Sequence, residues 1–231
     1  RQDNFFALGG DSIQSLRIIA KAKRLGFELT PRQMFEHQTI ADLASVATRV
    51  AVQTHAVDLE RDFPLTPIQQ WFFDQAMPRP DHWNQALLLK PETALDTSAL
   101  EAIYQHHDAL RLRFSRRNGE WLQAYGAPGK PDDLLWSVAT TPEQLADECD
   151  QAQASLDLAE GPLMRALHAR LDDGSERLLL AVHHLGIDGV SWRILLDDLM
   201  QAYGQARRGE TVDLGAKGIP FQFWADQLPT L

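Results

Sequence analysis

Two short stretches of this sequence carry residue types that could do chemistry. The first is Leu8-Gly9-Gly10-Asp11-Ser12, which places a serine hydroxyl where a helix begins. Asp11 can cap that helix, and Gln14 three residues later completes a capping-box pattern. Free backbone N–H groups and the positive end of the helix dipole favour a phosphate here, and the two glycines keep the approach open. On these residues alone, an ordinary N-terminal cap with a serine beside it is the alternative.

The second stretch is His183-His184-Leu185-Gly186-Ile187-Asp188-Gly189, where a predicted strand ends and a helix follows. Neighbouring residues of a strand point to opposite faces, so His183 and His184 cannot both face one site. The same geometry counts against a metal held by the pair, and we expect no metal site. One exposed imidazole would be a credible general base. Without further context, two partly buried histidines at a strand end are the alternative.

Patterns of apolar residues and caps predict the elements that position these stretches. Around Ser12 they predict a helix that ends at Gly26, a short helix after Thr30-Pro31 and a third helix after Thr39. A new domain opens with a helix after Thr66. The rest alternates, with strands at 86–89, 111–114, 120–125, 163–171 and 177–183, and helices at 98–107, 142–156 and 190–206.

Composition limits the classes of function. The 231 residues are 44% hydrophobic and 23% charged, with a net charge of −10, which argues against a nucleic-acid or anionic-membrane surface as the main partner. No apolar run approaches the ~20 residues that a membrane helix needs, and no signal peptide opens the chain, so we expect a cytoplasmic protein. The single cysteine, Cys149, excludes an internal disulfide and lies on an apolar helical stripe.

The order helix, short helix, helix around Ser12 resembles a thiolation (peptidyl carrier) domain of a nonribosomal peptide synthetase. The resemblance covers residues 1–50, with 51–60 as a linker. It implies that Ser12 carries a covalent 4′-phosphopantetheine arm, with Asp11 and Gly10 as its neighbours. The first helix of such a domain is missing here, so we expect the protein to extend upstream.

The motif from His183 to Gly189 fits the HHxxxDG pattern of the condensation-domain superfamily, whose fold resembles chloramphenicol acetyltransferase. Three features are more similar to epimerization domains than to condensing ones, namely 190–195, 67–73 and Asp11 directly before the serine. The resemblance implies an α/β two-domain chain. An incomplete helical carrier bundle would be followed, over 61–231, by the N-terminal lobe of the fold, an α+β lobe with a mixed sheet.

The resemblance also implies roles for residues. His184 would face the active-site channel and take or return the α-proton of a thioester, while His183 points into the fold. Asp188, followed by Gly189, would pair with Arg111, whose segment 106–114 resembles another superfamily motif. The histidines of that segment, His106 and His107, are then helix-end residues.

Inversion needs a second acid on the other face, which the family takes from a glutamate of a C-terminal lobe. That lobe is missing from this chain, so we expect the chain alone to be inactive.

The resulting hypothesis is an epimerase that converts an aminoacyl or peptidyl thioester from L to D. Its expected partners are an upstream adenylation domain, a downstream condensation domain and a phosphopantetheinyl transferase. Two alternatives stay open. A condensation domain would use the same histidine to assist amide formation between carrier-bound substrates, although the 190–192 segment argues against it. A non-catalytic fragment would only dock the carrier, with structural histidines.

Overall fold

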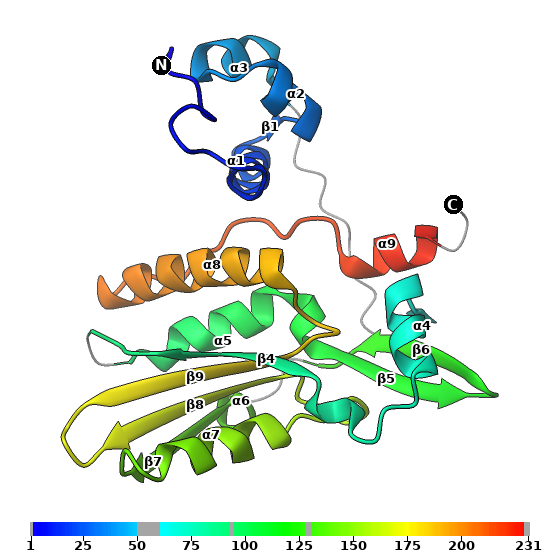
Figure 1. The fold of residues 1–231 in the computed structure, drawn as a ribbon, viewed down its shortest axis with the longest axis vertical. Coiled ribbons are helices and arrows are strands. Elements are labelled where there is room, and N and C mark those ends of the chain that lie inside the picture. Colours follow the sequence, from blue (N-terminus) through cyan, green and yellow to red (C-terminus); the bar gives the residue numbers. More distant parts are fainter. Residues whose placement is uncertain (1, 50–60, 93–94, 128–130, 229–231) are drawn as a thin grey trace. The chain divides into compact units, whose positions relative to one another are not determined.

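The computed structural model of the chain describes residues 2–49, 61–92, 95–127 and 131–228 (Figure 1). It separates into two compact units, one formed by Arg1–His55 with Gly215–Ile219 and the other by Ala56–Leu214 with Pro220–Leu231. The predicted linker at 51–60 lies outside the described residues.

The described residues of the first unit form three helices, as the caps predict. They are α1 (Ser12–Arg24), α2 (Pro31–Glu36) and α3 (Ile40–Val46), and the two-residue strands β1 (Phe27–Glu28) and β2 (Thr48–Arg49) pair antiparallel. Thr30 and Thr39 cap α2 and α3 through their side chains. After α1 the chain turns at Gly26, which has φ +78°. Each of these boundaries follows from a local capping signal.

The core of the first unit is small. Among its described residues only Ser15 and Met34 are buried. Phe6 stacks on Phe35 with ring centroids 5.2 Å apart. Leu8 keeps 76% of its surface exposed. Met34 is therefore the central apolar contact of this unit.

A four-stranded mixed sheet forms the centre of the second unit. Its order is β4 (Asn84–Leu89), β9 (Glu176–His183), β8 (Met164–Leu171) and β7 (Leu135–Thr140). The β4–β9 and β8–β9 pairs are antiparallel, and β7 runs parallel to β8. The predicted mixed sheet and the predicted β8–β9 hairpin are both confirmed.

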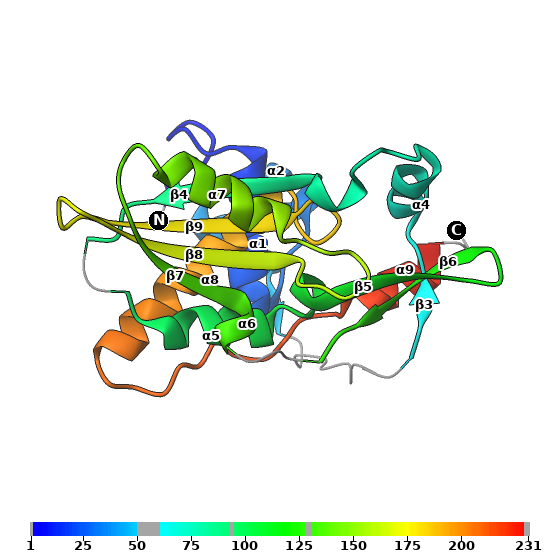
Figure 2. The same cartoon turned by 90° about the horizontal axis from the view of Figure 1, so that it is seen from below.

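Helices cover both faces of this sheet (Figures 1 and 2). On one face, α5 (Thr97–His106) and α8 (Gly189–Arg207) bury the larger apolar cluster, which includes Leu100, Leu180 and Trp192. On the other face, α7 (Leu145–Ala154) packs Cys149 and Ala152 against the strands. The cysteine is thus a core residue, as its position on an apolar stripe predicts.

A second, three-stranded sheet adjoins the first within this unit. Its order is β3 (Phe63–Pro64), β6 (Glu120–Tyr125) and β5 (Leu112–Arg117), and α4 (Pro67–Asp74) and α9 (Phe221–Gln227) pack beside it. Three one-turn elements complete the lobe: η1 (Pro80–His82), η2 (Asp108–Arg111) and α6 (Pro131–Leu134). Of these, η1 and η2 directly precede β4 and β5.

Three element predictions need correction. The strand predicted from Arg111 begins at Leu112, because Arg111 closes the η2 turn. The helix predicted at 142–156 is shorter, since α7 begins only at Leu145. The strand β7 was not predicted, although four of its six residues are apolar, and it pairs parallel to β8. In the described part of the chain, no helix has the length and apolar character to span a membrane.

Candidate active site and carrier serine

Ser12 is the first residue of α1, and its side chain is exposed. Asp11 precedes it in extended backbone and accepts a hydrogen bond from the backbone N–H of Gln14 at 2.7 Å. This is the aspartate half of the predicted capping box. In a complete capping box the side chain three residues after the cap also accepts the backbone N–H of the cap residue. Gln33 does this for Thr30 and Gln69 for Thr66. Among the described contacts of α1, only the Asp11 bond is formed.

The two glycines before Asp11 serve different purposes. Gly9 has φ +92°, a conformation that side chains with a Cβ rarely adopt. Gly10 has the ring of Phe5 above it, and a Cβ there would lie 2.5 Å from that ring. The absence of a side chain at Gly10 therefore lets Phe5 pack against it. The exposed hydroxyl of Ser12 fits a covalently attached phosphodiester.

The paired histidines lie at the end of β9, and their side chains diverge as predicted. His183 is the last strand residue and is fully buried, whereas His184 opens the following turn and is exposed. Backbone hydrogen bonds hold both residues in place. The His183 N–H donates to the carbonyl of Leu163 and the His184 N–H to that of Trp83, each at 2.8 Å.

Both ring nitrogens of His183 are occupied by backbone groups. Its Nδ1 accepts the N–H of Leu185 at 3.1 Å, so Nε2 carries the hydrogen that it donates to the carbonyl of Pro80 at 2.8 Å. Burial lowers the pKa of His183, although the bond to Pro80 opposes this. Phe72 packs edge-on against the ring. His183 is thereby held as a neutral, structural side chain.

His184 has the opposite tautomer. Its Nδ1 lies 2.8 Å from the carbonyl oxygen of Ile187, which can only accept, so Nδ1 carries the hydrogen. The lone pair is then on Nε2, which faces the side-chain amide of Gln85 at 3.2 Å. An exposed imidazole with its basic nitrogen directed away from the backbone can accept a proton from a bound substrate.

Asp188 caps α8, shortly after this turn. One carboxylate oxygen accepts the backbone N–H groups of Val190 and Ser191 at 3.0 and 2.7 Å and the hydroxyl of Ser191 at 2.7 Å. Partial burial would raise the pKa of Asp188, but these hydrogen bonds together outweigh it and hold the pKa below its usual range. Gly189 is the first residue of α8, and a Cβ there would meet no atom within 4 Å.

The predicted pairing of Arg111 with Asp188 is wrong. Arg111 is 1% exposed and forms its ion pair with Asp108, three residues earlier in the η2 turn. Its remaining donors reach carbonyls of Tyr104, Gln105 and Gly126. Arg111 therefore joins the end of α5 to the start of β5, and the carboxylate of Asp188 is engaged by its own helix.

Sequence reasoning missed Gln85 and Trp192 as neighbours of His184. The indole N–H of Trp192 donates to Oε1 of Gln85 at 2.8 Å, and the amide nitrogen of Gln85 faces His184. The predicted strand began at 86, one residue too late to include Gln85, which is the second residue of β4. A signal was present, because Gln85 shares a strand face with two leucines at 87 and 89.

A phosphopantetheine attachment-site profile matches residues 1–47, and a condensation-domain profile matches residues 59–229. The second match covers most of the chain. The chain belongs to the condensation-domain family. It joins a phosphopantetheine-binding carrier domain to a condensation-superfamily domain, as the motifs predict, and its cofactor is 4′-phosphopantetheine.

Known proteins are similar to this chain over most of its length. The chain is 46% identical over 242 residues to a linear gramicidin synthase protein of Brevibacillus parabrevis, a match that covers 98% of this chain and spans 5% of the length of that protein. Among solved structures, the epimerization domain from the third module of tyrocidine synthetase B is 34% identical with a TM-score of 0.69. That match covers 77% of this chain and 42% of the other chain.

A condensation domain is also similar in structure. The first condensation domain of the calcium-dependent antibiotic synthetase is 26% identical with a TM-score of 0.57, over 68% of this chain and 40% of that one. Both neighbours have the chloramphenicol-acetyltransferase-like architecture predicted for the second unit. The identity and the TM-score are higher for the epimerization domain.

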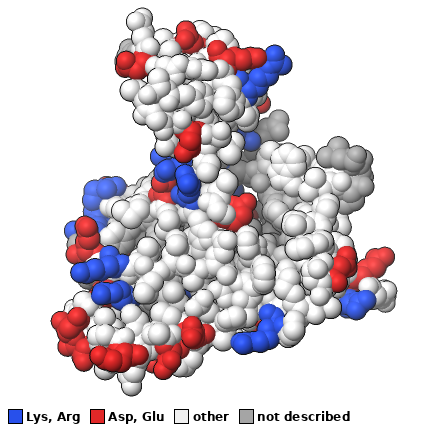
Figure 3. All heavy atoms as spheres, in the orientation of Figure 1, with Lys and Arg blue, Asp and Glu red and all other residues white. Residues whose placement is uncertain are grey.

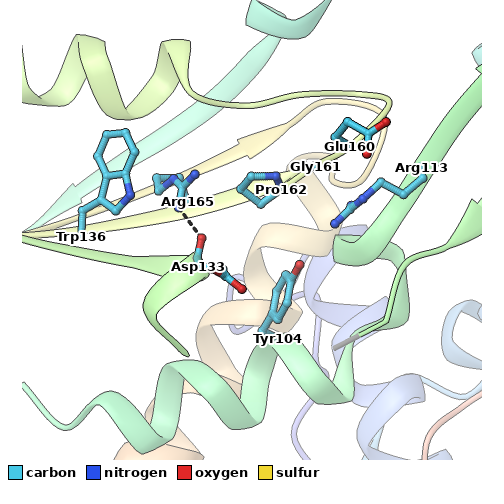
Figure 4. A pocket seen from close by; sticks show the side chains of 8 residues that line it. All are labelled: Tyr104, Arg113, Asp133, Trp136, Glu160, Gly161, Pro162 and Arg165. Carbon is cyan, nitrogen blue, oxygen red and sulfur yellow. Dashed lines mark hydrogen bonds between the residues drawn. The ribbon is translucent and has the colours of Figure 1, made fainter. Parts of the chain in front are cut away.

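The condensation domain has a further polar pocket, whose lining does not include His183 or His184 (Figure 4). Side chains of both charges line it, among them Arg113, Asp133, Glu160 and Arg165. Arg165 donates to the backbone carbonyl of Asp133 and covers the ring of Trp136. These contacts engage the guanidinium of Arg165 at the start of β8.

The surface in Figure 3 carries acidic and basic side chains in small, interspersed groups, with acidic ones gathered along the edge of the condensation domain that contains α7 and the β8–β9 hairpin. Among the described residues, no group of three or more His, Cys, Asp or Glu side chains is arranged to hold a metal ion.

Proposed function

We propose that this chain is part of a nonribosomal peptide synthetase that epimerizes the α-carbon of an aminoacyl or peptidyl group carried on Ser12. The observation that carries the choice is the similarity to the epimerization domain, at 34% identity and a TM-score of 0.69, against 26% and 0.57 for the condensation domain. The geometry of His184 supports the same reaction class, because proton transfer needs an exposed, neutral imidazole.

The attached cofactor supplies a thioester, which makes the neighbouring Cα–H more acidic than an amide would. His184 then takes that proton at Nε2, while its Nδ1–H remains on the carbonyl of Ile187. The bond to Ile187 stabilises the imidazolium as it forms. Delivery of a different proton to the other face of the carbon, by a second acid, inverts the centre.

His184 can exchange a proton with only one face of the α-carbon. Among the described residues, its Nε2 faces the amide of Gln85 and not a carboxylate. Inversion also needs a second acid on the other face of the carbon, and we propose that the described residues do not supply it and that this chain alone does not epimerize. An adenylation domain and a phosphopantetheinyl transferase would load Ser12, and a condensation domain would use the D-configured product.

The test uses the full protein that contains this chain. Ser12 is loaded with an L-aminoacyl group in heavy water, and both chirality and deuterium at the α-carbon are followed. We expect D product and deuterium incorporation, both lost in His184→Ala and both retained in His82→Ala, which removes an exposed histidine nearby. Retained L configuration without deuterium uptake would refute the epimerase.

The second candidate, a condensing enzyme, is favoured by the likeness to a condensation domain. Addition of a loaded acceptor carrier to the same assay distinguishes the two. Amide product that depends on His184, with no change at the α-carbon, would support condensation. If neither reaction occurs and the carrier still binds, the domain only docks the carrier.

A further inference from the structure

Gln85 is a polar side chain on the apolar face of an outer strand. It shares its face of β4 with Leu87 and Leu89, which pack against the larger apolar cluster. Its partner across the strand pair is Val182, a fully buried residue of that cluster. A half-buried amide in such surroundings loses water and needs protein partners. The partners it has therefore indicate why an amide is placed there.

The first partner of Gln85 determines how its amide is oriented. Trp192 of α8 is 8% exposed, and its indole N–H lies 2.8 Å from Oε1 of Gln85. An indole nitrogen can only donate, so the amide atom that faces it must be the oxygen. The NH₂ end of Gln85 consequently points the other way, to Nε2 of His184 at 3.2 Å.

The second partner must therefore accept, which determines the tautomer of His184 independently of Ile187. An amide N–H can be received only by a ring nitrogen that has a lone pair, so Nε2 must be unprotonated. The carbonyl of Ile187 requires the same state from the other side, because it needs a hydrogen on Nδ1. Two neighbours from different elements thus favour one tautomer and one ring orientation.

We propose that Gln85 and Trp192 are positioning residues that hold His184 with its basic Nε2 ready for the substrate proton. The proposal rests on the proposed function, in which His184 is the base. Trp192 acts only through Gln85. The Gln85–His184 bond of 3.2 Å is longer than the usual spacing of about 2.9–3.0 Å and lies at an exposed side chain, so a substrate can replace it.

The discriminating variant is Trp192→Phe, which keeps an aromatic ring in the core and removes the indole N–H. The amide of Gln85 can then rotate and present its oxygen to His184. In the full protein we expect kcat to fall about tenfold, the equivalent of one lost hydrogen bond, with KM unchanged. Trp224→Phe, an exposed tryptophan on α9, is the matched control and should keep full activity.

Nitrogen-15 NMR of labelled histidine gives a readout that does not depend on catalysis. The signals of His184 are identified by their loss in His184→Ala. We expect the Nδ1–H tautomer in the wild type and a mixture of tautomers in Trp192→Phe. Gln85→Glu keeps an acceptor for Trp192 and removes the donor to His184, so we expect it to populate the imidazolium. Gln85→Leu provides a second variant should Trp192→Phe fail to fold.

The outcomes separate this proposal from the proposed function. A tautomer shift in Trp192→Phe in a protein that never epimerizes would support the positioning role and refute the epimerase. Epimerization that depends on His184, with the tautomer and kcat unchanged in both Trp192→Phe and Gln85→Leu, would refute the positioning role. An Nε2–H tautomer in the wild type would also refute it.

Discussion

Two helices of this chain begin in the same way, and each beginning lies at a residue of functional interest. Asp11 precedes α1 and Asp188 precedes α8, both in extended backbone, and each carboxylate accepts a backbone N–H of the first turn. Asp11 accepts one such bond at its helix. Asp188 accepts three, because the hydroxyl of Ser191 adds to two N–H groups.

The residue after each cap is what differs. Ser12 presents an exposed hydroxyl, whereas Gly189 presents no side chain and has no atom near its Cβ position. The cap residue therefore determines where the helix begins, and the residue after it determines which chemical group is present at the helix N-terminus. In α1 it offers a group that can be modified, and in α8 it leaves open space.

The largest expected effect comes from removing the hydroxyl of Ser12. Ser12→Ala should abolish attachment of 4′-phosphopantetheine, because no other atom at that position can form the phosphodiester. Intact-protein mass spectrometry after treatment with a phosphopantetheinyl transferase measures this. Ser15→Ala is the control, since Ser15 lies one turn away and is buried. Modification of Ser12→Ala would show that another residue carries the arm.

The next largest effect concerns the glycines beside the two caps. In Gly10→Ala the new methyl group would lie 2.5 Å from the ring of Phe5, so we expect the first unit to lose about 1–3 kcal/mol of stability. In Gly189→Ala nothing lies within 4 Å, and the change should stay within about 0.5 kcal/mol. Hydrogen exchange of the backbone amides of α1 and α8 measures the loss of stability in each variant. Equal effects would mean that the space around the two glycines does not differ.

The caps also show what sequence alone can predict. Asp11, Thr30, Thr39 and Asp188 act on backbone groups two or three residues ahead, so their helices could be placed from local patterns. The alternation that separates His183 from His184 is equally local. Such predictions succeed because one short segment contains both partners of the interaction.

Partners that are far apart in sequence could not be predicted in this way. The long-range pair that the family resemblance implied, Arg111 with Asp188, was wrong, and the ion pair that forms is the local one with Asp108. Gln85, Trp192 and His184 meet because β4 pairs with β9 and α8 packs on that sheet. The sequence predicts His184 as the base, and only the tertiary structure shows that Gln85 and Trp192 lie beside it.

A smaller loss of stability is expected when either capping aspartate is removed. Replacement of an N-cap aspartate by alanine costs about 1 kcal/mol, and the cost rises with the number of bonds lost. We expect Asp188→Ala to approach about 2 kcal/mol and Asp11→Ala to stay near 1 kcal/mol or below. Urea unfolding, followed separately for each unit, measures both. A larger loss for Asp11→Ala would show that the three bonds at Asp188 add little to stability.

The smallest effect is the pH dependence of the α8 cap. The pKa of Asp188 is lower in the folded protein than the value of about 3.9 expected after unfolding. Its contribution to stability is therefore complete above that pH and is lost as the pH falls through the folded pKa. We expect the stability of the wild type relative to Asp188→Asn, which keeps a capping acceptor, to decrease between about pH 5 and 2.

Ser191→Ala separates the groups that cause this dependence. It removes the hydroxyl bond to Asp188 and leaves both backbone N–H bonds in place, so the pKa of Asp188 should move back toward its usual range. The loss of stability on acidification should then be smaller than in the wild type and larger than in Asp188→Asn. An unchanged pH profile would mean that the backbone of α8 alone stabilises the carboxylate. In that case the two caps would differ only in the number of N–H groups that they accept.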